Sequence, residues 1–117
     1  MDDALREKLI ANEFDVDGTM QRFLNNEALY FKCLKKFLTD PNFEMLKKAK
    51  AEGNVEEAFK SAHTMKGFLS NLGINKIYVP LQPVVEKLRS GDINIDEELV
   101  TLERLYKETY EIVESIE

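Results

Sequence analysis

Apolar residues recur along this chain at spacings of three and four positions, the period of an amphipathic helix rather than of a strand. The clearest run has six such positions: Val55, Ala58, Ala62, Met65, Leu69 and Leu72. Asn54 precedes this run, Glu57 follows three positions later, and Gly73 stands after the last member, so start and stop signals for a helix enclose it. No segment has the alternation of a strand. The pattern predicts an all-α protein.

The same pattern predicts four longer helices and two short N-terminal ones. The longer helices are expected at about residues 27–52, 54–72, 77–90 and 95–116, and the short ones at about 2–11 and 17–25. Because the connections between the long helices are short, we expect an antiparallel up-down-up-down four-helix bundle, with the short helices packed on it as a lid. Residues 1–117 should form a single domain.

Prolines mark two irregular places in this pattern. Asp40 and Pro41 look like an N-cap followed by proline at the first helical position, so the first long helix should kink or restart there. Pro80 and Pro83 lie among the apolar positions of the third long helix. Since proline is tolerated only in the first turn, we expect regular hydrogen bonding there to begin near Val79 or Pro80.

Composition and charge exclude several classes of function. Sixteen Lys and Arg against 22 Asp and Glu give a net charge of −6, which disfavours general binding to nucleic acid or to an anionic membrane. No apolar run approaches the ~18 residues of a membrane span, and the N-terminus lacks the features of a signal peptide. Cys33 is the only cysteine, which excludes an internal disulfide and a multi-thiolate metal site. We therefore expect a cytoplasmic protein.

His63 is the only histidine, and its place in the helical pattern suggests a role. A lone helical histidine is by default structural, either buried or incidental on the surface. The apolar seam of residues 55–72 is centred slightly to one side of Ala62, and His63 falls roughly 130° away from that centre at about 100° per residue. The ring should therefore face water.

Residues three and four positions from His63 share its face of the helix. Lys66 can bring its ammonium near a group attached to the imidazole, such as a phosphoryl oxygen. Gly67 costs ~1 kcal/mol relative to Ala inside a helix, so its small size should serve access to the ring. Phe59 fits either a residue flanking the core or an apolar docking contact, and Lys60 and Ser70 complete the face.

The segment Ala62-His63-Thr64-Met65-Lys66-Gly67-Phe68-Leu69-Ser70-Asn71-Leu72-Gly73 resembles the signature of histidine-containing phosphotransfer (HPt) domains. In that family an alanine and histidine are followed by an apolar residue, Lys-Gly and a later Leu-Gly. The resemblance extends to Asp15-Val16-Asp17, to the Ala51–Asn54 turn and to Arg89-Ser90-Gly91-Asp92, and so covers nearly the whole chain.

The resemblance implies a phosphorelay intermediate in two-component signal transduction. His63 would accept a phosphoryl group from a receiver-domain aspartate or a kinase and pass it to another receiver, with Lys66 as the adjacent positive group and Gly67 giving access. Where many members carry Gln or Glu to hydrogen-bond the histidine, this chain has Val85, and Gln82 is a possible substitute. Phe59, Lys60, Ser70 and Gln82 are the expected partner-binding residues.

Near neutral pH much of an imidazole is already the neutral nucleophile, so His63 needs no strong base of its own. The expected protein is therefore a monomeric carrier without enzymatic activity, cofactor or metal, and its partners are response-regulator receiver domains and a sensor or hybrid histidine kinase. Mg²⁺ would belong to the receiver.

Two other interpretations remain open at this stage, while autokinase activity is disfavoured because no glycine-rich nucleotide loop is present. The chain could be the phosphoacceptor domain of a larger chemotaxis-type or hybrid histidine kinase, although a start at Met1 and a final helix reaching the end of the chain favour a standalone protein. It could also be a helical adaptor that binds a partner without being phosphorylated.

Overall fold

The computed structural model describes residues 1–116, and its regular elements within that range are all helices, as predicted. The only backbone pairing of the β type within it is an isolated bridge between Phe14 and Ile74. The elements in chain order are α1 (Asp3–Ala11), α2 (Val16–Arg22), α3 (Glu27–Lys35), the 3-10 helix η1 (Lys36–Thr39), α4 (Asn42–Ala51), α5 (Val55–Leu72), α6 (Asn75–Arg89) and α7 (Asp96–Glu114). None of these helices is both long enough and apolar enough to cross a membrane.

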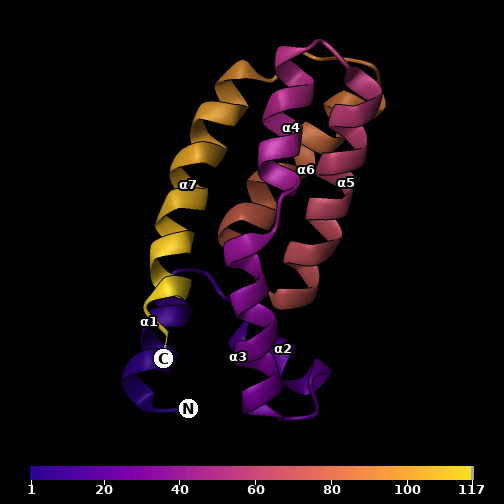
Figure 1. Cartoon of the computed structure of the whole chain (residues 1–117). Coiled ribbons are helices and arrows are strands. Elements are labelled where there is room, and N and C mark those ends of the chain that lie inside the picture. The colour runs from indigo at the N-terminus through magenta and orange to yellow at the C-terminus, as the bar shows by residue number, and fades with distance from the viewer. Residues whose placement is uncertain (117) are drawn as a thin grey trace.

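The longer helices lie side by side, and the chain reverses direction between α4 and α5, between α5 and α6, and between α6 and α7 (Figure 1). α5 packs most extensively against α4 and α6, and α6 packs against α7. α3, η1 and α4 follow one another along one side, while α1 and α2 lie at the end of the molecule where α5 ends (Figure 1). The result is an elongated molecule with extents of 44 × 24 × 21 Å.

The apolar seam predicted for residues 55–72 forms the inner face of α5. Five of its six positions are buried, and Val55, in the first turn, is half-buried. They join a single core cluster to which every α-helix of the described chain contributes at least one side chain. Burying an aliphatic side chain stabilises the folded state by ~1.5–3 kcal/mol. Burial of this shared core is therefore the main source of the free energy that holds the helices together.

The predicted helix over residues 27–52 restarts near Pro41, and the restart falls one residue later than expected. α3 gives way to η1, Asp40 adopts an extended conformation, and Pro41 occupies the N-cap rather than the first helical position. The residue before a proline is driven away from the helical region, which explains the break at Asp40. Its carboxylate accepts a hydrogen bond from the Asn42 side-chain amide at 2.8 Å.

The prediction that regular helix begins near Val79 or Pro80 is wrong. α6 begins at Asn75 and contains both Pro80 and Pro83. The N-terminal segment starts this helix early, because the Asn75 amide donates to the Glu13 carbonyl at 3.1 Å beside the Phe14–Ile74 bridge. The buried side chains of α6 then outweigh the two hydrogen bonds that the prolines cannot donate, each worth only ~0.5–1.5 kcal/mol.

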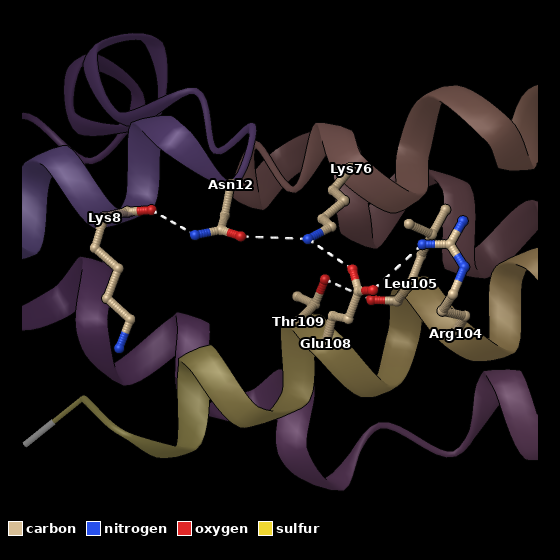
Figure 2. Close-up of polar contacts among 7 residues, drawn as sticks. All are labelled: Lys8, Asn12, Lys76, Arg104, Leu105, Glu108 and Thr109. Carbon is tan, nitrogen blue, oxygen red and sulfur yellow. Dashed lines mark hydrogen bonds and ion pairs between the residues drawn. The ribbon is translucent and has the colours of Figure 1, made fainter.

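The N-terminal helices are attached to the end of α5 and the start of α6. The Asp15 amide donates to the Gly73 carbonyl at 2.8 Å, and the Arg22 guanidinium donates to the Asn71 carbonyl at 3.1 Å. Arg22 thus satisfies a carbonyl that the end of α5 leaves without a helical partner. The preceding turn of the chain is joined to α6 by Asn12, whose side-chain oxygen accepts from Lys76 Nζ at 3.2 Å (Figure 2).

Lysines of α4 and α6 pair with acidic residues of α7 along much of its length. From α4 these pairs are Lys47–Glu103 and Lys50–Asp96, and from α6 they are Lys76–Glu108 and Lys87–Glu98. Residues 92–117 hold nine Asp and Glu against two Lys and Arg, so the net negative charge of the protein is concentrated there. The acidic surface therefore belongs largely to α7, which is held electrostatically to both of its neighbours.

Candidate functional site

His63 lies at the middle of α5, the ninth of its eighteen residues, and its side chain is exposed as predicted. Capping residues at the two ends of α5 set where the helix begins and ends, and so place His63 at its middle. The Asn54 side chain accepts a hydrogen bond from the Glu57 amide at 3.1 Å and begins the helix, and Gly73 ends it in the left-handed conformation at φ 69°. The buried seam then turns the opposite side of the helix, with His63 on it, toward solvent.

Lys66, Gly67 and Ser70 lie on the face of α5 that carries His63. Gly67 is exposed, and a Cβ atom built on it would have no heavy atom within 4 Å. Packing inside the molecule therefore does not require glycine at this position, although glycine weakens a helix. Lys66 is partly exposed and forms no ion pair within the described part of the chain. One face thus combines an imidazole, an uncommitted ammonium and open space.

Phe59 lies one helical turn before His63, and the two rings are in contact. Their centroids are 5.6 Å apart with 36° between the ring planes. The guanidinium carbon of Arg89, the last residue of α6, lies 5.3 Å from the centroid of the same Phe59 ring. Arg89 is not among the site residues predicted from the sequence. Its contact with Phe59 joins residues thirty positions apart, and local spacing carries no signal for such a contact.

Neither Val85 nor its expected polar substitute, Gln82, provides a hydrogen bond to the histidine. Val85 is fully buried in the core. Gln82 is half-buried on α6 and does not hydrogen-bond the His63 ring. Over residues 1–116, no hydrogen bond or ion pair involves the imidazole of His63. The contact with Phe59 is therefore the specific side-chain interaction that the ring makes.

A groove runs beside the site between the first half of α5 and the end of α6. Its volume is about 470 Å³ and its apolar surface comes from Val55, Phe59 and Leu88, with Lys60 and Arg89 among the charged residues that line it. Of the predicted partner-binding residues, Phe59 and Lys60 line this groove, whereas Ser70 and Gln82 lie outside it. Lys60 also pairs with Glu57 at 3.3 Å.

A polar cluster lies between α1, α6 and α7 (Figure 2). Lys76 Nζ contacts Glu108 at 2.8 Å, Arg104 reaches the other oxygen of that carboxylate at 3.2 Å, and the Thr109 hydroxyl donates to the Leu105 carbonyl at 2.8 Å. These contacts join α7 to α6, and Asn12 joins the end of α1 to the same cluster.

Among the side chains of residues 1–116, no group of three or more His, Cys, Asp or Glu is placed to hold a metal ion. Within residues 1–116, no carboxylate forms a hydrogen bond or an ion pair with His63. An exposed neutral imidazole can still act as a nucleophile and carry a group supplied by another molecule. Comparison of the chain with protein-family models, with curated proteins and with solved structures gives no match.

Proposed function

We propose that this protein is a histidine phosphotransfer domain that carries a phosphoryl group on His63 between receiver domains, or from a histidine kinase to a receiver. The observation that carries the proposal is the face of α5 on which exposed His63 lies beside Lys66, which has no ion pair within residues 1–116, and beside Gly67, whose missing side chain leaves open space. In the proposed architecture, α3 and η1 with α4 form one helix of an antiparallel four-helix bundle, α5, α6 and α7 form the others, and α1 and α2 form a lid.

The proposed reaction moves a phosphoryl group and leaves the rest of each partner intact. The unprotonated ring nitrogen of His63 attacks phosphorus of a receiver's aspartyl phosphate, a nitrogen–phosphorus bond forms, and the phosphorus–oxygen bond to the aspartate breaks. The carboxylate leaves with the bonding electrons, and the reverse step returns the group to a receiver. The main catalytic requirement of such a transfer is that the attacking nitrogen, the phosphorus and the leaving aspartate oxygen lie in line.

Each partner has a distinct share of this chemistry. Lys66 offsets charge on the phosphoryl oxygens, a modest and salt-sensitive contribution because its ammonium is partly exposed. Gly67 lets the partner's backbone approach the ring. The receiver supplies the acidic pocket and its Mg²⁺, so this protein carries the group without being an enzyme itself. We propose a cytoplasmic monomer in this role.

Transfer from a phosphorylated receiver domain tests the proposal. The parent protein and His63→Gln are each incubated with a receiver that has been phosphorylated and freed of excess donor, and phosphate on each protein is followed with time. Uptake by the parent and none by His63→Gln is the expected result. If the two proteins bind the receiver equally and neither takes up phosphate, the protein is an adaptor and the proposal fails.

The phosphoacceptor domain of a larger kinase would perform the same chemistry with a different donor. A panel of receivers and histidine kinases from the source organism distinguishes the two roles. Rapid uptake from receivers indicates a relay intermediate, whereas uptake from a kinase's catalytic domain alone indicates a kinase segment.

A further inference from the structure

The Phe59 ring contacts two residues whose chemistry differs, His63 on its own helix and Arg89 on α6. We infer that Phe59, held by Arg89, is the positioning residue that sets the orientation of the His63 imidazole for phosphoryl transfer. The inference rests on the proposed function, and it assigns to an aromatic contact a task that no hydrogen-bonding side chain performs among the described residues.

Phe59 is well placed to restrict the histidine. The 5.6 Å between ring centroids lies within the range of about 4.5–7 Å over which aromatic pairs attract one another, and the spacing of four residues keeps both rings on one helix face. Phe59 is half-buried and packs against the core. It therefore forms a fixed wall against which the exposed ring rests.

Arg89 in turn limits the motion of Phe59. A guanidinium within about 6 Å of a ring centroid is attracted to the aromatic face, and here the distance is 5.3 Å. Arg89 Nε also lies 3.4 Å from Glu86 Oε2 on the same helix, an exposed ion pair that adds a weak second restraint on the arginine side chain. The Phe59 ring is thus tied to α6 as well as to α5, and the His63 ring depends on both helices.

Orientation matters because His63 has no polar partner among residues 1–116. A free side chain on a helix distributes itself over two common χ1 wells and a broad χ2 range, so only part of the population presents its nucleophilic nitrogen correctly. Removing the Phe59 ring should reduce the productive fraction, and with it the transfer rate, by about twofold to fivefold. Replacing Arg89 should also lower the transfer rate, but by a smaller factor, because the Phe59 ring itself remains.

A small phosphoryl donor separates positioning from docking. With phosphoramidate, the His63 nitrogen bonds to phosphorus while the donor's phosphorus–nitrogen bond breaks and ammonia leaves with the electron pair. This donor is too small to use the groove that Phe59 and Arg89 line. A docking residue therefore affects transfer from a receiver alone, whereas a positioning residue affects transfer from both donors.

The experiment compares the parent with Phe59→Leu, Phe59→Tyr and Arg89→Gln, and takes Arg104→Gln on α7 as the matched surface-arginine control. Rates of His63 phosphorylation are measured with phosphoramidate and with a phosphorylated receiver, and the His63 ring protons are followed by NMR. We expect Phe59→Leu to slow both reactions twofold to fivefold and to shift the ring protons. Phe59→Tyr should restore both properties, Arg89→Gln should have a smaller effect, and Arg104→Gln none.

Two results would overturn the inference. One is a Phe59→Leu variant that keeps parental rates from both donors, whatever its ring-proton shifts, because loss of the Phe59 ring current alone can move those shifts. The other is slowing with the receiver alone, which would make Phe59 a docking residue. A parent protein that takes phosphate from neither donor would instead refute the proposed function, so the two failures are distinguishable. Thermal unfolding of each variant checks that the fold is retained.

Discussion

Lys76 Nζ lies 2.8 Å from Glu108 Oε2, and this pair is one of four that join α7 to the helices on either side of it. The hydrogen bond from Lys76 lowers the pKa of Glu108, and the hydrogen bond from Lys87 likewise lowers the pKa of Glu98. A carboxyl group whose pKa is lower in the folded state binds its proton less readily there than in the unfolded chain. Its contribution to stability is present above the ordinary value of 4.5 and is lost as pH falls below it.

We therefore expect the free energy of unfolding to fall as pH drops below about 4.5, measured by urea denaturation at a series of pH values. Glu98→Gln combined with Glu108→Gln should flatten this dependence, because neither amide titrates. Equal stability of the parent at pH 7 and at about pH 3 would contradict the role given to these pairs.

The Tyr30 hydroxyl is buried, and no hydrogen bond within residues 1–116 offsets the loss of its contact with water. The rest of the Tyr30 side chain is fully buried as well. Burial is the main reason that the pKa of Tyr30 is raised to about 12. An unpaired buried polar group costs ~1–3 kcal/mol, so Tyr30→Phe should leave the free energy of unfolding unchanged or raise it by up to that amount. A loss of more than ~1 kcal/mol in urea denaturation would show that the hydroxyl has a favourable interaction.

Gly73 and Gly53 form a natural pair for testing how the N-terminal helices are attached. Both have positive φ, 69° and 68°, so alanine is strained at either position. A Cβ at Gly53 would meet no heavy atom within 4 Å, whereas one at Gly73 would collide with Thr19 Oγ1 and the Asp15 carbonyl. We expect Gly53→Ala to cost ~1 kcal/mol of unfolding free energy and Gly73→Ala at least ~2 kcal/mol. Equal losses would mean that α2 does not pack on this turn.

Substitutions of Gly67 should have opposite effects on the stability of the fold and on the rate of phosphoryl transfer. Because its Cβ position is open, Gly67→Ala should raise the free energy of unfolding by ~1 kcal/mol. Gly67→Gln should also fold normally, yet its side chain would occupy the space beside His63 and slow single-turnover transfer from a receiver by about tenfold or more. If Gly67→Gln transfers phosphate at the parental rate, the space beside His63 is not needed for the partner's approach.

Local signals allowed much of this fold to be predicted. The start of α5 after Asn54 and its end at Gly73 depend on capping and backbone conformation within a few residues, and both were predicted correctly. The exposure of His63 followed from the same helix, because burial of its apolar seam fixes the rotation of every other side chain. Asn54 and Glu57 have the spacing of a capping box, in which each side chain bonds the other residue's amide, but only the Asn54 side chain does so. The Glu57 side chain pairs with Lys60 instead.

Interactions between distant residues account for what the sequence could not supply. α6 begins early because Glu13 and Phe14, about sixty positions upstream, hold its first residues. The partner of the Phe59 ring is likewise on another helix, at Arg89. Sequence spacing also indicates that α7 is acidic without indicating which carboxylates face lysines of α4 and α6. Each of these contacts depends on how the helices pack.

The central claim is that His63 becomes phosphorylated, and because the chain has one histidine, the chemical lability of its phosphate tests that claim directly. After transfer from a phosphorylated receiver, the protein is isolated and its phosphate is measured after acid and after base treatment, with peptide mapping by mass spectrometry. We predict phosphate that is lost in acid, survives base and maps to His63, and none on His63→Gln. Acid-stable phosphate, or equal phosphate on His63→Gln, would contradict the proposed function.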